Sequence, residues 1–449
     1  MKSFHPALRA LLPVFFLPIL LSAQAPDTFH LTGCGKFWGN DHPVPNIRMQ
    51  VTFQNNLVAG PGFGGDSGPD NACVEVSIPA AAVSGYTGFF VNGERLGPDD
   101  DVRNGLSVAD LICLNRHILG LEPLPLYAQL AADVNKSGSI AGFDLVELRK
   151  VLLGIYPNFP NSANWRIVSP NCTFPNPANP FQAVCNAFPI AELPNYDGDT
   201  LSLVAVKVGD LDGDYKFDGP YQAPQGGNAV PLFMPALNLQ AGDSVAIPVY
   251  LKQPLDPGGF QAGFRYNTAS LSLFDIAPVQ GTSDNWAVFA AQGLITNVLL
   301  TTGSPIPADT LAYLMFAVKK GGPLNQAIWL DSTGFTSIFS SGCGTGGPLE
   351  LEFETASAVS AATAGIRISP AYPNPFVSQA IVQLELDQPT VLRLEVWDIN
   401  GRLTHVQDYD LASGRQTVVI PAEAVARGSL GVYRLMAEGF TAVGKVMRK

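Results

Sequence analysis

The sequence predicts a mainly β protein, made of several antiparallel β-sandwiches with one small all-α pair of helices. Only 14% of the 449 residues are charged, whereas Gly and Pro are abundant, at 44 and 37 residues. Segments of alternating apolar residues recur between Gly, Pro, Asn and Asp turns, which is typical of half-buried antiparallel strands. One stretch, residues 110–154, instead spaces its leucines as a helix does. A chain of this length should hold three or four domains.

The first segment, residues 1–25, is predicted to be a secretory signal peptide. Lys2 and Arg9 precede an apolar run at 11–21, and small residues follow at 21–25. The apolar run is shorter than the roughly 20 residues that cross a membrane, and no later run approaches that length, so no transmembrane segment is expected. The net charge of −12 argues against nucleic acid as a partner and agrees with calcium binding.

Residues 26–98 are predicted to form the first β-sandwich, because apolar positions alternate between turn residues. The phrase HPVPNIRMQV, within residues 33–51, resembles a transthyretin-like or carboxypeptidase-regulatory-like module. That resemblance also implies a small β-sandwich.

Residues 133–144 have the pattern of a twelve-residue calcium loop. Gly138 stands at the sixth position, where such a loop turns sharply, and a Leu-rich amphipathic helix follows. Ca²⁺ needs six to eight oxygen ligands at roughly 2.3–2.6 Å, one of them a backbone carbonyl. The side chains at the first, third, fifth and twelfth positions and the carbonyl at the seventh predict the ligand set Asp133, Asn135, Ser137, Asp144 and Ser139.

The same unit occurs 34 residues upstream in a less regular form, since DLICLNRHILG (110–120) overlays DLVELRKVLLG (144–154). Its fifth position holds Arg103 and its glycine comes one place late, so this site should bind Ca²⁺ more weakly. The candidate ligands of this first loop are Asp99, Asp101, Gly105 and Asp110. The alternative interpretation of both loops is a pair of capped helices after Asp/Asn/Gly turns.

Two such loop–helix units in tandem, over residues 99–155, resemble a type I dockerin, the module that binds cohesin domains. The resemblance implies Ca²⁺ as the cofactor and a protein partner that contacts the exposed faces of the two helices. Phe143, if exposed, is the expected hot spot, because buried aromatic side chains dominate interface energetics. The partner-facing positions implied by the family are Val108, Ala109, Asn115 and Arg116 in the first repeat and Gly142, Phe143, Arg149 and Lys150 in the second.

Residues 156–224 are rich in Pro and Asn and are predicted to be a loop region that contains one strand, at 201–210. An acidic segment, DLDGDYKFDG, follows at 210–219. Asp210, Asp212 and Asp214 form a third candidate cation site there. Because no Leu-rich helix follows, a plain acidic turn is an equal alternative.

Residues 225–357 are predicted to form a second sandwich. Alternating apolar residues occur in VAIPVYL (245–251), GFQAGFRYNTASLSL (259–273) and DTLAYLMFAVKKG (309–321). The order and residue patterns of these segments resemble a cohesin domain, whose jelly-roll sandwich is shared with several carbohydrate-binding modules. A sugar-binding platform would need coplanar exposed aromatic side chains, for which Trp286 and Trp329 are the candidates.

Residues 364–449 contain YPNPF (372–376), QAIVQLELDQPTVLRLEVWDINGR (379–402), GVYRLMAEG (431–439) and a basic end, KVMRK (445–449). Together these resemble a type IX secretion C-terminal sorting domain, and the alternating apolar residues predict an Ig-like sandwich. The resemblance implies export across an outer membrane, removal of this domain, and attachment at the cell surface or release. The Ala/Ser/Thr-rich segment 354–365 is predicted to be the cleavable tether.

Six cysteines in an exported chain can pair in fifteen ways. The favoured pairs are Cys34–Cys73, in two strand-like segments, and Cys172–Cys185, which bracket a Pro/Asn-rich loop. Cys113 is predicted to lie on the polar side of its helix, where it is either covered by a neighbouring domain or bonded.

No catalytic motif is recognisable, since the five histidines share no metal-binding spacing and no nucleophile or phosphate-loop motif occurs. The sequence therefore predicts a non-catalytic secreted or cell-surface interaction protein. Its binding would be calcium-dependent, through the dockerin-like and cohesin-like modules, with polysaccharide breakdown as the suggested context. The alternative is a surface protein whose sandwich at 225–357 binds polysaccharide.

Overall fold

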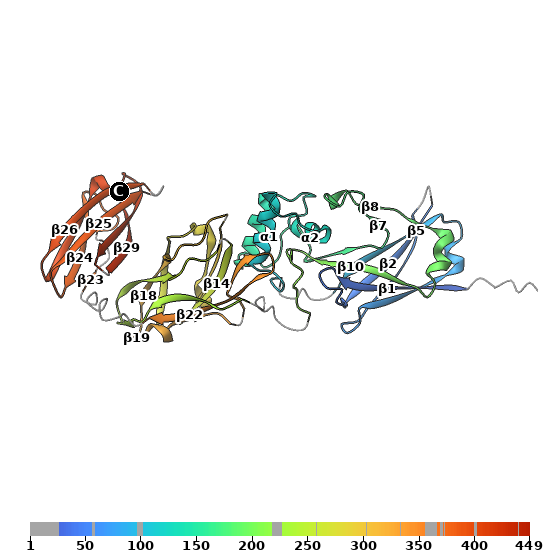
Figure 1. Cartoon of the computed structure of the whole chain (residues 1–449), viewed down its shortest axis with the longest axis horizontal. Coiled ribbons are helices and arrows are strands. Elements are labelled where there is room, and N and C mark those ends of the chain that lie inside the picture. The colour runs from blue at the N-terminus through green and yellow to red at the C-terminus, as the bar shows by residue number, and fades with distance from the viewer. Residues whose placement is uncertain are drawn as a thin grey trace, which may run out of the picture.

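The computed structural model describes residues 27–55, 59–96, 102–217, 227–256, 258–301, 303–332, 334–354, 366–368, 371, 373–398, 402–438 and 440–449. Three β-sandwiches and one helical unit follow one another along the long axis of the molecule (Figure 1). The predicted mainly β fold class is therefore confirmed. The signal peptide, most of the expected tether at 354–365, Asp99 and Asp101 lie outside the described residues.

The first sandwich consists of two four-stranded sheets, with strand orders β4-β1-β10-β6 and β3-β2-β5-β9. Their alternate side chains enclose one apolar core, as the in–out pattern of β2 illustrates. The strands are β1 (Thr28–Phe37), β2 (Ile47–Gln54), β3 (Ala59–Asp66), β4 (Cys73–Pro79), β5 (Gly88–Arg95), β6 (Trp165–Val168), β9 (Phe188–Pro189) and β10 (Thr200–Lys207).

The segment 156–224 was expected to be a separate loop region, but its described part, residues 156–217, completes this first sandwich. Strand β10 pairs in parallel with β1, from Thr32↔Thr200 to Phe37↔Ala205, and β6 pairs with β10. The described residues between 38 and 96 offer no strand to that side of β1, whose backbone groups bond instead to β10 and to the residues just before it, where the Gly198 amide donates to the His30 carbonyl at 3.0 Å. The helical unit is thus an insertion between β5 and β6, and the sandwich extends beyond the expected boundary at residue 98.

The helical unit, residues 102–155, contains α1 (Val108–Ile118), α2 (Leu126–Ala132) and α3 (Gly142–Leu152). The bounds of α1 and α3 differ by 34 residues at both ends, as the sequence repeat requires. The Ser107 side chain caps α1 by accepting a hydrogen bond from the Ala109 amide. Both helices end just before a glycine with positive φ, Gly120 after α1 and Gly154 after α3.

The second sandwich is one continuous sheet that bends back on itself, in the order β15-β18-β13-β11-β22-β21-β14-β17-β16, with β20 beside β14. The bend lies in β22, because residues 345–348 pair with β21 whereas residues 349–354 pair with β11. The strands are β11 (Val230–Pro235), β13 (Ser244–Tyr250), β14 (Gly259–Tyr266), β15 (Leu271–Pro278), β16 (Trp286–Phe289), β17 (Leu294–Leu300), β18 (Thr310–Val318), β20 (Ile328–Leu330), β21 (Ile338–Gly342) and β22 (Thr345–Glu354); β12 (Asn238–Leu239) pairs with β19 (Gly322–Pro323).

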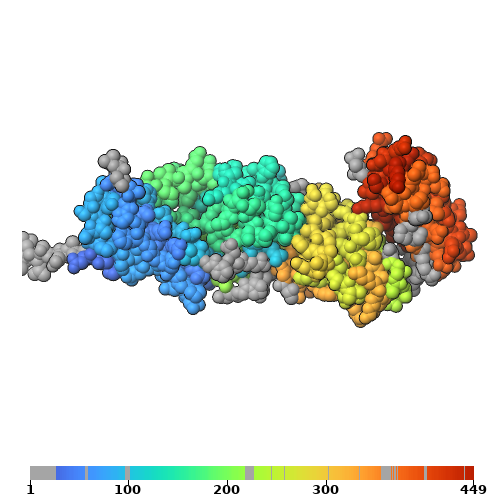
Figure 2. Space-filling model, turned by 180° about the vertical axis from the view of Figure 1, so that it is seen from behind, coloured from blue at the N-terminus to red at the C-terminus, as the bar shows by residue number. Residues whose placement is uncertain are grey.

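Two strands of this sandwich, β14 and β17, are buried on both faces. One face contributes Phe260 and Phe264 to the sandwich core. The other face is covered by the helical unit, so that Val298 and Ile338 belong to the same apolar cluster as Leu111 of α1. Viewed from behind, the helical unit fills the space between the first and second sandwiches (Figure 2).

The third sandwich packs a three-stranded sheet, β23-β24-β27, against a four-stranded one, β26-β25-β28-β29. The apolar residues expected to share its core, Val382, Leu384 and Leu386 with Leu392, Leu394 and Val396, are all buried. The strands are β23 (Ile366–Ile368), β24 (Gln379–Leu386), β25 (Thr390–Asp398), β26 (Leu403–Leu411), β27 (Gly414–Pro421), β28 (Leu430–Ala437) and β29 (Phe440–Met447).

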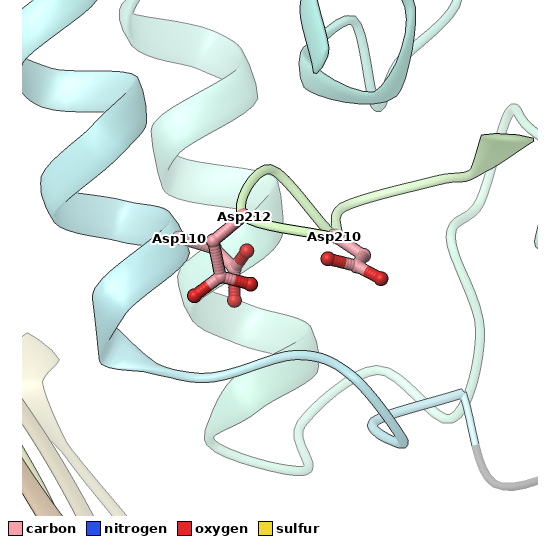
Figure 3. Close-up of side chains that lie close together, drawn as sticks. All are labelled: Asp110, Asp210 and Asp212. Atoms are coloured by element: carbon pink, nitrogen blue, oxygen red, sulfur yellow. The ribbon is translucent and has the colours of Figure 1, made fainter. Parts of the chain in front are cut away.

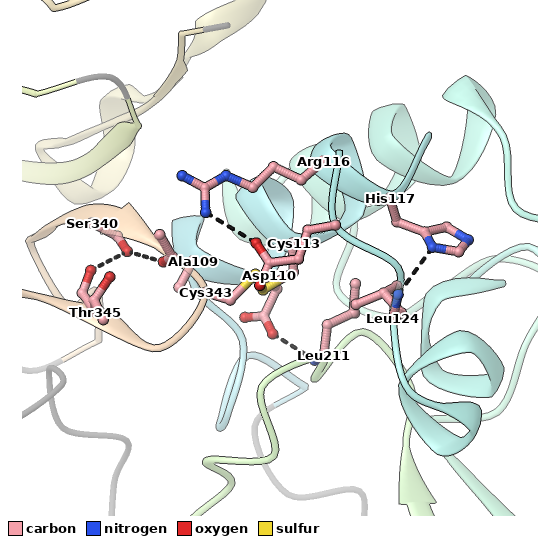
Figure 4. The surroundings of a disulfide bond; sticks show 12 residues. Ala109, Asp110, Cys113, Arg116, His117, Leu124, Leu211, Ser340, Cys343 and Thr345 are labelled. Carbon is pink, nitrogen blue, oxygen red and sulfur yellow. Dashed lines mark hydrogen bonds and ion pairs between the residues drawn. A yellow bond between two sulfur atoms is a disulfide. The ribbon is translucent and has the colours of Figure 1, made fainter. Parts of the chain in front are cut away.

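Three disulfides join the six cysteines. Cys34–Cys73 links β1 to β4, and Cys172–Cys185 links β7 (Cys172–Thr173) to β8 (Val184–Cys185). The third, Cys113–Cys343, joins α1 to the turn between β21 and β22 of the second sandwich (Figure 4). Cys113 is buried at this contact, which explains why a cysteine occupies a position that is polar in the second repeat.

Candidate calcium centres

The loop before α3 is folded around the carboxylate of Asp133. One oxygen of Asp133 accepts a hydrogen bond from the Ser137 amide at 2.8 Å, and the other accepts one from the Gly138 amide at 3.1 Å. The turn needs left-handed backbone at two places, Lys136 (φ 59°) and Gly138 (φ 76°). Glycine adopts this conformation without the steric cost that a side chain brings, so Gly138 fits its place.

The twelfth position closes the same loop. Asp144 is fully buried, and its Oδ2 accepts a hydrogen bond from the Ala141 amide at 2.9 Å, while its Oδ1 accepts one from the Asn135 amide at 3.3 Å. Burial raises the pKa of Asp144, a rise that the amide donors oppose. Ser137 Oγ lies 3.2 Å from the Ser139 carbonyl oxygen. The structure therefore gathers all five predicted ligands, Asp133, Asn135, Ser137, Ser139 and Asp144, into one loop.

An arginine from the first sandwich lies against this loop and was not anticipated from the sequence. Arg166, on β6, donates to the backbone oxygens of Leu130 and Asp133, and its Nη1 lies 3.7 Å from Asp133 Oδ2. The guanidinium is mostly buried, and burial lowers its pKa. One positive charge thus already offsets part of the negative charge of this loop.

A second group of carboxylates lies at the start of α1. One carboxylate oxygen from each of Asp110, Asp210 and Asp212 lies within 4.8 Å of the other two, and Figure 3 shows the three side chains converging from α1 and from the segment after β10. Asp110 and Asp210 are fully buried. Asp110 accepts hydrogen bonds from the Ser107 amide at 2.7 Å and from the Leu211 amide at 2.6 Å.

The other two carboxylates of the group differ in their hydrogen bonding. Asp210 accepts hydrogen bonds from the Gly213 amide at 2.7 Å and the Tyr215 amide at 3.1 Å. Both carboxylate oxygens of Asp212 are buried without a hydrogen-bond partner among the described residues. Burial, followed by the mutual repulsion of the charges, raises the pKa of Asp110 and Asp210 well above the ordinary range, and burial also raises the pKa of Asp212.

The structure thus combines residues that the sequence assigned to two different sites. Asp110 was expected to act with Asp99, Asp101 and Gly105, whereas it meets Asp210 and Asp212 of the third candidate site. Gly105 (φ 78°) contributes its small size, since a β-carbon there would lie 2.8 Å from the Tyr215 Cα and 3.1 Å from Asp210 Oδ2. One sequence signal could have indicated this: segment 210–214 has acidic first, third and fifth positions but no helix, whereas the first repeat has a helix but Arg103 at its fifth position.

Two of the four partner-facing residues predicted for the first repeat are not accessible, and a third contacts the second sandwich, which corrects that expectation. Val108 and Ala109 are fully buried, and the Val108 amide donates to Gln261 Oε1 on β14 at 2.8 Å. Arg116 donates to the Ser341 carbonyl of β21 at 3.1 Å (Figure 4). Asn115 is partly buried. The face of α1 that the family resemblance assigns to a partner is therefore occupied by the second sandwich of the same chain.

The second repeat is different, because Phe143 at the start of α3 exposes 79% of its surface. Arg149 and Lys150 are partly buried, and the Lys150 ammonium lies over the Tyr156 ring at 5.1 Å. The α3 end also contacts the second sandwich, where Thr296 Oγ1 donates to the Leu153 carbonyl at 2.8 Å. Phe143 therefore remains as an exposed aromatic side chain of the helical unit.

The two tryptophans considered for sugar binding do not form one exposed strip. Trp286 packs on the sandwich core and stacks on Phe264, with ring centroids 6.4 Å apart. Trp329 is 45% exposed and borders a shallow groove with Leu351 and Phe353. The described part of the chain has no helix long and apolar enough to span a bilayer.

No known family profile and no curated protein sequence matches the chain. Similar solved structures include cohesins. The seventh ScaB type I cohesin of Pseudobacteroides cellulosolvens is 15% identical, with 28% of this chain and 88% of that chain covered and a TM-score of 0.22. A type I cohesin–dockerin complex from Clostridium thermocellum is 14% identical, with 30% of this chain and 94% of that chain covered and a TM-score of 0.22. A type II cohesin dyad of Acetivibrio cellulolyticus is 8% identical, with 46% of this chain and 88% of that chain covered and a TM-score of 0.22. Identities and TM-scores this low do not assign the chain to a family.

Proposed function

We propose that this chain is a non-catalytic secreted or cell-surface interaction protein, whose helical unit binds Ca²⁺ and holds two β-sandwiches together. In this proposal the exposed start of α3 contacts a protein partner of the cohesin or dockerin kind. The third sandwich serves as the type IX sorting domain, and it is removed on export together with the signal peptide.

The observation that carries the proposal is the contrast between the two repeats. The face of α1 is used within the chain, through Val108, Arg116 and Cys113. The equivalent region of α3 leaves Phe143 exposed. An exposed aromatic side chain beside a preformed helix N-terminus is the kind of residue that dominates interface energetics.

The ligand set of the loop at 133–144 supports Ca²⁺ as the metal. Its donors are carboxylate, amide, hydroxyl and carbonyl oxygens, with neither histidine nor cysteine, and hard cations of the Ca²⁺ type prefer oxygen donors. Asp133, Asn135, Ser137, Ser139 and Asp144 would hold the ion, with water completing the six to eight ligands. The bound ion would neutralise the acidic loop and add its binding free energy to the stability of the fold.

A binding experiment with the secreted fraction of the source organism tests the partner proposal. The mature chain is immobilised, and bound proteins are identified with and without EDTA. We expect EDTA to remove a β-sandwich partner, and Phe143→Ala to weaken its binding by about thirtyfold or more, since hot-spot truncation costs about 2 kcal/mol or more. Phe274→Ala, at an equally aromatic and 56% exposed position on the second sandwich, is the matched control. Equal losses in both variants would contradict an interface at α3.

The sorting proposal has a separate readout. Deletion of residues 364–449 should retain the rest of the chain in the periplasm, with its domains folded, because the third sandwich has its own core. Mature protein at the cell surface should end near residues 354–365 and lack KVMRK. Recovery of the intact C-terminus by mass spectrometry would contradict removal of the domain.

Polysaccharide binding is the second candidate function, and Trp329 beside the groove is the observation that favours it. Retention of the mature chain on insoluble polysaccharide, abolished by Trp329→Ala and insensitive to Phe143→Ala, would support this candidate instead.

A further inference from the structure

We propose that Asp110, Asp210 and Asp212 form one Ca²⁺ site, a calcium loop split between two segments about a hundred residues apart. The split site rests on the proposed function in one respect, namely that the helical unit binds Ca²⁺. In this proposal the first repeat receives the ligand half of its loop from the segment after β10 rather than from its own residues 99–103.

The negative charge of these three carboxylates has no ion-pair partner in the part of the chain that the structure describes. Asp110 and Asp210 are fully buried, and none of the three carboxylates forms an ion pair with Lys or Arg in the described ranges. Both oxygens of Asp212 are buried without a hydrogen-bond partner among the described residues, and one carboxylate oxygen from each of the three aspartates lies within 4.8 Å of the other two (Figure 3). A buried carboxylate without a partner is costly, and a divalent cation bound among the three oxygens removes that cost.

The first half of the split loop matches the first half of the contiguous loop. Asp210 accepts hydrogen bonds from the amides four and five positions later, at 3.3 and 3.1 Å. Asp133 accepts hydrogen bonds from the amides at the same two positions, at 2.8 and 3.1 Å. The fourth position is left-handed in both, with φ of 75° at Gly213 and 59° at Lys136. Asp210 and Asp212 therefore occupy the first and third ligand positions.

The second half comes from the start of α1. Asp110 accepts a hydrogen bond from the amide three residues before it, Ser107, as Asp144 does from Ala141. The two halves are joined by Asn104, whose side chain pairs with the Lys216 backbone at 2.8 and 3.3 Å. Asp110 is thus the twelfth-position ligand of a loop whose first position is Asp210.

Counting bound Ca²⁺ in the full mature chain, by equilibrium dialysis and native mass spectrometry, tests the split site. We expect two ions in the wild type, one in Asp212→Asn, one in Asp133→Asn, and two in the double variant Asp99→Asn/Asp101→Asn. Two ions in Asp212→Asn, or loss of one in the double variant, would overturn the split site in favour of the contiguous first loop. If Asp133→Asn is the only variant that loses an ion, the contiguous loop binds Ca²⁺ as the proposed function requires, and the split site does not exist.

Hydrogen exchange on the wild-type chain provides a second test that needs no variant. Added Ca²⁺ should increase protection in residues 104–111 and 210–216 together, with the same dependence on calcium concentration, because one ion joins both segments. Protection confined to residues 133–144 would overturn the proposal.

Discussion

The two repeats of the helical unit share a sequence pattern but have different surroundings. Repeat two folds its loop from twelve consecutive residues, and Arg166 already supplies one positive charge to it. Repeat one starts its helix with the same Asp, Asp110, but meets two further carboxylates and no ion-pair partner within the described residues. The difference shows that a local repeat fixes the helix and its twelfth-position carboxylate, while the remaining ligands depend on what the fold delivers.

The largest expected effect concerns calcium and stability. At a concentration about a thousandfold above its dissociation constant, a ligand that binds the native state alone adds about 4 kcal/mol per site to the free energy of unfolding. Asp212→Asn should remove the contribution of the split site in Ca²⁺ and have no destabilising effect in EDTA, because Asn keeps the size of the side chain and removes one buried negative charge. Thermal unfolding in Ca²⁺ and in EDTA measures both. Equal destabilisation in the two media would mean that Asp212 has a structural role alone.

The second effect concerns the disulfide that connects repeat one to the second sandwich. Repeat one is tied to the second sandwich by Cys113–Cys343, which closes 230 residues, whereas Cys172–Cys185 closes only 13. Cys113→Ala/Cys343→Ala should lower the free energy of unfolding by about 3–4 kcal/mol, more than the control Cys172→Ala/Cys185→Ala, because a longer closed loop restricts the unfolded chain more. Denaturant titration of both double variants measures this, and a larger loss in the control would contradict it.

A third, smaller effect tests the charge compensation that only repeat two has. Arg166→Gln should lower the free energy of unfolding in EDTA by about 2 kcal/mol, since hydrogen bonds made by a charged group contribute roughly 1.5–3 kcal/mol. Arg166→Lys should recover part of the loss, because it retains the charge near Asp133. If the glutamine variant is as stable as the wild type without calcium, the arginine does not compensate the loop.

The smallest effect is a pH dependence linked to a histidine, a residue type that only repeat one contains. His117 has its pKa lowered by burial, and its Nδ1 accepts a hydrogen bond from the Leu124 amide at 3.1 Å; the equivalent residue of repeat two is Val151. A lowered pKa means that the unfolded chain binds the proton more readily, so this contribution is complete above about pH 6.5 and is lost as pH falls toward the folded pKa. Between pH 7.5 and pH 5, the free energy of unfolding measured by denaturation should fall more for the wild type than for His117→Gln. The difference should be less than about 1 kcal/mol, because the ring is partly exposed. Parallel pH profiles would exclude the histidine.

Local patterns were sufficient for the strands and for the contiguous loop. Alternation at period two predicted the buried faces of β13, β14 and β24, because each side chain of a strand points to the side opposite its neighbour. The spacing of oxygens over residues 133–144 predicted a loop that brings those oxygens together, because every ligand is within twelve residues of the next. The 34-residue offset between α1 and α3 followed from the sequence repeat for the same reason.

The pairing of strands that are distant in the sequence could not be predicted from any local sequence pattern. The association of β10 with β1 depends on which backbone edge remains without a partner after 38–96 have folded, a property of the assembled sheet. That pairing carries Asp210 and Asp212 to the start of α1, 101 residues away in sequence at the Leu211–Asp110 hydrogen bond. The burial of Val108 and Cys113 against β14 and β21 also depends on the arrangement of whole domains.

The sequence by itself determined the mainly β class, the two loop–helix repeats and the chemistry of the acidic side chains, because these depend on the spacing of neighbouring residues. Only the tertiary structure decided which carboxylates share a site and which helix face remains exposed. Asp110 meets Asp212, and Phe143 stays in solvent while Val108 does not. The physical reason is that burial and charge proximity are set by contacts between segments distant in the chain, and in this protein those contacts pass through the inserted helical unit.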